Sequence, residues 1–224
     1  GKPARRFDRE HGAGGGRVAW NDAGNTPNVH FALFESEAIP VLLALSNLKP
    51  GPNTESKLGY TGPGSGYVVY CEGGTLVGQR GSAQAFDSNG KLIKSFRGDS
   101  GSGHAKNFID AVRSRDHKQL NADVETGHHS SSWCHLANIA CGTAKSTTFD
   151  RIPSRPDVDA PWSELVETMR NHLADHGVDL SQTPVTLSQP LQFDAKKAQF
   201  TGAGSEPANE WVRREYRDGF VVEG

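Results

Sequence analysis

The first half of the chain carries short apolar runs separated by turn-forming residues. These runs are residues 28–35, 39–46, 66–72, 75–79, 83–86 and 91–96. They are rich in β-branched and aromatic side chains, which favour strands. Asn89-Gly90 favours a tight hairpin between Phe86 and Leu92, because both residue types tolerate the positive φ of the central turn positions. The pattern predicts two strands followed by an antiparallel meander.

The second half shows helical spacing instead. Three helices are expected: one capped by Ser102, one from about Val124 to Lys145, and one from Asp159 to Gly177. In the first, Phe108, Ile109 and Val112 share one side. In the last, apolar side chains recur at helical intervals, at Trp162, Leu165, Val166, Met169 and Leu173. Residues 190–202 are expected to form a small hairpin, and residues 207–220 a short helical turn.

Strands that come first and helices that follow predict an α+β fold, with an open, largely antiparallel sheet and helices packed on one face. Residues 1–16 are charged and then glycine-rich, so we expect a connector or disordered end there. Residues 17–224 are expected to form a single domain, since the length suits one large domain.

Composition narrows the possible partners. The net charge of −2 arises from interspersed acids and bases, which predicts neither a nucleic-acid surface nor a membrane surface. No apolar run approaches the roughly 20 residues of a membrane span. The three cysteines form no disulfide framework, which favours a reducing, cytoplasmic setting, although secretion or periplasmic export remains open if a signal has been removed.

The stretch 125–142 is the richest in side chains that could bind a metal or act as nucleophiles, with three histidines and two cysteines. His128 and His135 are seven residues apart, about 10 Å along a helix, which is too far for one metal ion. Neither a Gly-x-Ser-x-Gly turn nor a catalytic-cysteine signature occurs. The apolar positions of this stretch are mostly small, so packing is the favoured interpretation, and no metal ligand or catalytic residue is predicted here.

Two glycine-rich stretches are tested as phosphate loops. Residues 14–19 fit Gly-x-Gly-x-x-Ala, but no apolar strand precedes them and no helical pattern follows. Residues 62–66 lead into a strand rather than out of one, and no Gly-x4-Gly-Lys-Ser/Thr motif occurs. No cofactor-binding residue is therefore predicted in this chain.

Several stretches together resemble the C-terminal domain of the glucose-fructose oxidoreductase, inositol dehydrogenase and rhizopine-catabolism family of NAD(P)-dependent oxidoreductases. They are residues 19–35, 64–78, 86–96, 104–140, 191–202 and 208–220. Residues 104–140 are the most specific part, because NFIDAVRSR, LNAD and GHHSSSWCHLANI occur in this order.

The resemblance implies a sugar or polyol dehydrogenase of carbohydrate metabolism, with NAD or NADP as cofactor. It also implies a homodimer or higher assembly through a sheet face. The family carries a catalytic lysine in Glu-Lys-Pro and an Asp with a His four residues later. Neither pattern occurs here, so no catalytic residue is carried over and the chain alone is expected to be inactive.

The substrate-binding candidates form a polar loop with one aromatic side chain, together with one histidine at a helix start. They are Trp20, Asn21, Asp22, Asn25, Thr26 and His128. An ordinary turn is the competing interpretation of this loop. For the whole chain, a free-standing, non-catalytic binding or scaffold module remains the alternative function.

Overall fold

A computed structural model of the chain describes residues 7–16, 26–36, 39–48, 65–154, 159–213 and 215–221. The chain divides into two compact units, one formed by residues 1–54 and 131–224 and the other by residues 55–130. We call them unit 1 and unit 2 and describe each by itself. Helix α2 (Val124–Thr143) begins in unit 2 and continues into unit 1.

Unit 1 contains a five-stranded antiparallel sheet in the order β3-β2-β1-β9-β8. Its strands are β1 (Phe7–Gly16), β2 (Val29–Ser36), β3 (Val41–Ser46), β8 (Lys145–Thr147) and β9 (Val185–Leu187). The central strand β1 pairs with β2 and β9, and a register shift falls between His11 and Gly14. Strand β2 is almost wholly buried from Val29 to Phe34, because it carries apolar side chains on both faces.

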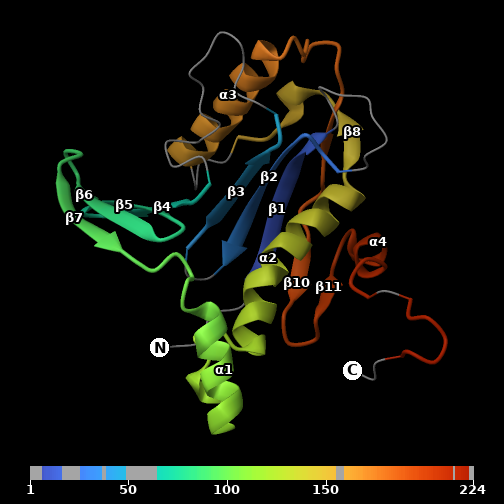
Figure 1. Cartoon of the computed structure of the whole chain (residues 1–224). Helices are drawn as coiled ribbons and strands as arrows, with labels where there is room; N and C mark the ends of the chain where they lie inside the picture. Colours follow the sequence, from blue (N-terminus) through green and yellow to red (C-terminus); the bar gives the residue numbers. More distant parts are fainter. Residues whose placement is uncertain are drawn as a thin grey trace. The chain divides into compact units, whose positions relative to one another are not determined.

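The second half of α2 crosses one face of this sheet (Figure 1). Successive residues of a strand point to opposite faces, so Ala32 and Phe34 share this face. They pack with four apolar residues of α2, Leu136, Ala137, Ile139 and Ala140. The small side chains of this stripe let the helix approach the strands closely, which confirms the packing interpretation of the segment.

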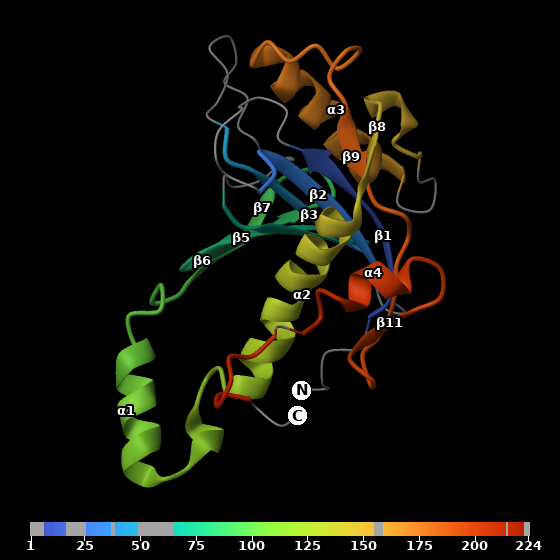
Figure 2. The ribbon, with the colours of Figure 1, turned by 90° about the vertical axis from the view of Figure 1, so that its right-hand side faces the viewer.

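A short hairpin and a last helix complete the same core. Strands β10 (Gln192–Asp194) and β11 (Gln199–Thr201) pair antiparallel, and α4 (Ser205–Asn209) follows (Figure 2). Leu191, Phe200 and Ala208 join the core beneath α2. The amide of Asn209 holds the hairpin to α4, since its Oδ1 accepts from Phe200 N at 2.7 Å and its Nδ2 donates to Phe200 O at 2.9 Å.

Helix α3 (Asp159–Asp175) contacts the opposite face of the sheet. The Trp162 ring meets Phe31 edge-on, with ring centroids 5.5 Å apart. His172 of α3 approaches Ser46, which lies opposite Val29 and therefore on the Phe31 face. The short helix η2 (Phe149–Arg151) lies nearby in this unit, where Arg170 covers the ring of Phe149.

Unit 2 contains the predicted meander, a four-stranded antiparallel sheet in the order β4-β5-β6-β7. Its strands are β4 (Tyr67–Cys71), β5 (Gly74–Gln79), β6 (Ser82–Asp87) and β7 (Leu92–Arg97). Phe86 and Leu92 face each other across the last hairpin, as predicted. The turn itself differs from the predicted one, because among its described residues only Gly90 has a positive φ. A register shift between Ala85 and Phe86 accommodates one extra residue in the hairpin.

Tyr67, Gly78, Ala83 and Phe96 form a row across this sheet, and Val69, Leu76, Ala85 and Lys94 form the next. We call Tyr67, Val69, Leu76, Ala83, Ala85 and Phe96 the apolar sheet face. Gly78 leaves room for the Tyr67 ring, which lies where a Cβ at residue 78 would be. Tyr67 is 52% exposed and Phe96 is 43% exposed, so this face is not covered as an ordinary core would be.

Helix α1 (His104–Ser114) and the short helix η1 (His117–Gln119) follow the meander. Asn107 joins them, because its amide donates to Gln119 O and accepts from Asn121 N. The predicted side of α1 is exposed at Phe108, Ile109 and Val112, and Ala111 is the buried residue of this helix. Unit 2 thus presents apolar side chains on both its sheet and its helix.

The expected α+β class with open antiparallel sheets is confirmed. Three details differ. Residues 7–16, expected in a connector, form β1, because strand pairing uses backbone groups that glycine also has. Helix α3 contacts the sheet face opposite α2, where helices on one face only were expected. The cap of α1 is Gly103, not Ser102.

Candidate functional site

The residues predicted for substrate binding fall mostly outside the described part of the chain. Trp20, Asn21, Asp22 and Asn25 lie outside it, whereas Thr26 is exposed just before β2 in unit 1. His128 is exposed on α2 in unit 2, with its ring centroid 5.5 Å from that of His129. Thr26 and His128 belong to different units, so each is described within its own unit.

The histidine- and cysteine-rich stretch has the geometry of a packing helix. The Ser130 hydroxyl donates to the carbonyls of Thr126 and Gly127, one turn back along α2. Cys134 is an exposed free thiol, and burial raises the pKa of the Cys141 thiol. Over the residues that the structure describes, no three His, Cys, Asp or Glu side chains gather as metal ligands.

A polar group that sequence reasoning missed lies at one end of the unit 1 sheet. His172 of α3 is 1% exposed, and its Nε2 lies 3.4 Å from the Oγ of Ser46 at the end of β3. The same hydroxyl oxygen accepts a hydrogen bond from Leu48 N at 3.1 Å. The His176 ring lies edge-on to His172 at 4.9 Å between centroids. We call Ser46, His172 and His176 the histidine group.

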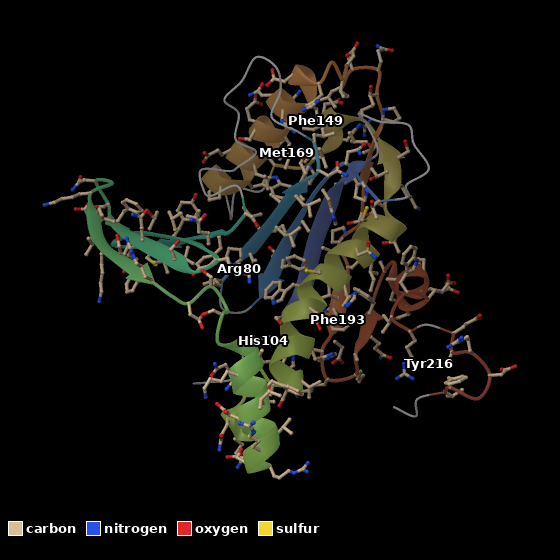
Figure 3. All side chains as sticks on the ribbon, in the orientation of Figure 1. Arg80, His104, Phe149, Met169, Phe193 and Tyr216 are labelled. Carbon is tan, nitrogen blue, oxygen red and sulfur yellow. The ribbon has the colours of Figure 1, made fainter. Side chains whose placement is uncertain are left out.

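Asn28 links the start of β2 to the neighbourhood of the histidine group. It is buried directly before β2, two residues after Thr26, and its Nδ2 lies 3.5 Å from Oδ1 of Asn47, the residue after Ser46. His172 could have been chosen as a candidate from the sequence, because it has i, i+4 spacing with His176 in His-Leu-Ala-Asp-His. Figure 3 labels Met169, one turn before His172 on the same helix.

Burial controls the charge of this group. Desolvation lowers the pKa of His172, the neighbouring His176 lowers it further, and Asp175 partly opposes both. Among the described atoms, His172 Nδ1 has no hydrogen-bond partner. His30 on β2 is also buried, desolvation lowers its pKa, and its Nε2 has no described partner. Both histidines are therefore held neutral at neutral pH.

We expect unit 1 to lose stability in mild acid. The folded-state pKa of His172 and His30 lies below the ordinary value of 6.5, so their contribution is complete above about pH 6.5. It falls as the pH drops from 6.5 towards the lowered folded values, because only the unfolded chain takes up these protons. Urea unfolding followed by tryptophan fluorescence reports unit 1, which contains all four tryptophans.

The substitution His172→Gln removes the titrating group and keeps a side chain that can reach Ser46. The free energy of unfolding should therefore change less between pH 7 and pH 5 in this variant. The matched control is His129→Gln, because His129 is an exposed histidine on a helix. If the free energy of unfolding of His172→Gln falls with pH as steeply as that of the unmodified chain, the role given to His172 is contradicted.

Unit 2 has an open depression of about 480 Å³ between the turn that joins β5 to β6 and the segment that leads from β7 to the start of α1. Arg80 and His104, both labelled in Figure 3, line it together with Asp99 and Ser100. Arg80 Nε donates to Ser100 O at 2.9 Å. The Asp99 carboxylate accepts from the backbone of Gly101 and Gly103, which lowers its pKa. These bonds hold the turn before α1, so the polar groups here have a structural explanation.

None of the helices in the described segments is long and apolar enough to cross a membrane.

Comparisons with known proteins do not limit the possible functions further. No family model matches the chain, and no curated protein and no solved structure matches it either, so its function is inferred from its own residues.

Proposed function

We propose that this chain is the substrate-binding and oligomerisation region of an NAD(P)-dependent sugar or polyol oxidoreductase. In this proposal the nicotinamide cofactor and the catalytic lysine come from a separate cofactor-binding domain, and the chain by itself is inactive. Hydride transfer requires a nicotinamide held against the substrate carbon and a base at its hydroxyl. The chain would supply the remaining wall of the substrate site and the contact between subunits.

The observation that carries this proposal is the apolar sheet face of unit 2. Tyr67, Val69 and Phe96 are all exposed there, on a regular antiparallel sheet with small residues at its centre. A monomer that acts alone rarely leaves such a contiguous apolar surface open to water. The proposed occupant is a second copy, because aromatic side chains at the sheet edges can pack over the small central residues of an identical face.

The substrate-binding part of the proposal rests on the loop that leads into β2. The loop residues Trp20, Asn21, Asp22, Asn25 and Thr26 combine amide, carboxylate and hydroxyl groups with one indole, a set suited to sugar hydroxyls and to the apolar face of a sugar ring. They precede Asn28 and the polar end of the unit 1 sheet. The resemblance given above directs the substrate class towards sugars and polyols.

Replacing Trp20 by Ala in the native oxidoreductase should raise KM or lower turnover about tenfold, the effect of one lost contact worth about 1.4 kcal/mol. The readout is NAD(P)H formation with a panel of sugars and polyols. The matched control is Trp211→Ala, since Trp211 is an exposed tryptophan near α4. Unchanged kinetics in Trp20→Ala would remove this loop from the substrate site. A native protein without any NAD(P)-dependent activity would favour the scaffold alternative.

A further inference from the structure

His172 and His176 have the spacing by which one helix offers two imidazoles to a single ion. Side chains at i and i+4 lie on the same helix face, with Cβ atoms about 5–6 Å apart. In this structure the two rings are 4.9 Å apart between centroids and inclined by 72°. His172 is in the last turn of α3, and His176 N donates to Leu173 O, so the helical path continues through His176.

The surroundings of His172 leave one ring nitrogen available. Ser46 Oγ accepts from Leu48 N and, having a second acceptor position, can also accept from His172 Nε2–H. In this tautomer Nδ1 carries a lone pair. That atom is buried and has no hydrogen-bond partner in the described part of the chain. A buried acceptor without a partner is unfavourable, and a cation would satisfy it.

We propose that His172 Nδ1 and His176 bind one divalent transition-metal ion of the kind that prefers imidazole, such as nickel or zinc. Ser46 acts as the positioning residue, because a hydrogen bond to the second ring nitrogen fixes the tautomer and orientation of a ligating histidine. The site goes beyond the proposed oxidoreductase function and does not depend on it.

The charge around the two rings suits a cation. A histidine ligates a metal only in its neutral form, and burial keeps His172 neutral at neutral pH. Asp175 is the acidic group that acts on His172, and its negative charge favours an ion at the two rings. Two protein ligands leave coordination positions open for water or for an oxygen or nitrogen ligand.

The test is the thermal unfolding of the whole chain, followed by tryptophan fluorescence with increasing nickel chloride. Nickel is the better probe because the three free cysteines would also bind zinc. We expect a saturable rise in the unfolding midpoint that a chelator reverses and that magnesium does not reproduce. His176→Gln should weaken nickel binding at least tenfold, and Ser46→Ala by about 10- to 100-fold.

The matched control is His129→Gln, because His129 and His128 are adjacent histidines on α2 that lack the i, i+4 spacing. This control should retain the full nickel response. If His176→Gln shifts the metal-free midpoint, equilibrium dialysis of nickel replaces the thermal readout. The proposal is overturned if the unmodified chain gives no response. It is also overturned if His176→Gln keeps the response, or if His129→Gln loses as much of it as His176→Gln.

Discussion

Replacing Phe34 by Ala should lower the free energy of unfolding of unit 1 by about 3–5 kcal/mol. Phe34 is 1% exposed on the sheet face that α2 covers, and its ring meets Trp133 edge-on at 5.0 Å between centroids. The substitution removes the burial of a large side chain and leaves a cavity between β2 and α2. The loss is a large share of the roughly 5–15 kcal/mol that stabilises a typical domain.

Urea unfolding followed by tryptophan fluorescence measures this effect. We expect a lower midpoint concentration of urea and an unchanged slope of the free energy of unfolding against urea concentration. The matched control is Phe220→Ala, because Phe220 is 68% exposed in the same unit. Its substitution should cost less than about 1 kcal/mol, the value of its exposed contact with Arg217. Equal losses in the two variants would mean that β2 and α2 do not form the core of unit 1.

Replacing Phe96 by Asp should abolish self-association of the chain at tens of micromolar. Phe96 ends the row that crosses the apolar sheet face from Tyr67, and the Nζ of Lys94 lies over its ring, 5.0 Å from the centroid. In a dimer formed through this face, the new carboxylate would lose its hydration against apolar side chains, and Lys94 is the one charged side chain described beside it. We expect the dissociation constant to rise at least 100-fold, which corresponds to about 2.8 kcal/mol.

Light scattering of the unmodified chain and the variant provides the measurement. The unmodified chain should have the mass of two or more copies, and Phe96→Asp the mass of one. Gln84→Asp is the matched control, because Gln84 is exposed on the opposite face of the same sheet and should leave the mass unchanged. A monomeric unmodified chain would contradict the proposed interface.

Local patterns were sufficient to predict most of the strands and helices. The spacing of Trp162, Leu165, Met169 and Leu173 matches the buried side of α3, and the run 28–35 matches β2. Strand β1 was missed because its sequence, FDREHGAGGG, has almost no apolar side chains, so only its pairing with β2 and β9 makes it a strand. Such pairing is a long-range property that local composition does not encode.

The faces of the sheet were harder to predict than its strands. The alternation in β2 showed apolar residues on both sides, but it did not show which helix covers each side. Contacts between Phe31 and Trp162 place α3 opposite α2. Likewise, the meander was predicted correctly, but the exposure of Tyr67 and Phe96 depends on what the rest of the chain leaves uncovered.

The candidate site shows the same limit. Histidines and cysteines are dense in residues 125–142, yet His128 is exposed there. His172 looked like one more residue of an amphipathic helix, and its burial against Ser46 comes from the docking of α3 onto β3. The i, i+4 pair with His176 was readable in the sequence, but its burial was not.

We propose that the chain works as part of a larger NAD(P)-dependent enzyme. The most direct test is the size of the native protein in its source cells, detected with an antibody raised against this chain. We expect a band larger than the 224 residues of the chain by a cofactor-binding domain of at least about 100–150 residues. A band at the size of the chain itself would contradict the claim and leave a free-standing binding or scaffold module as the function.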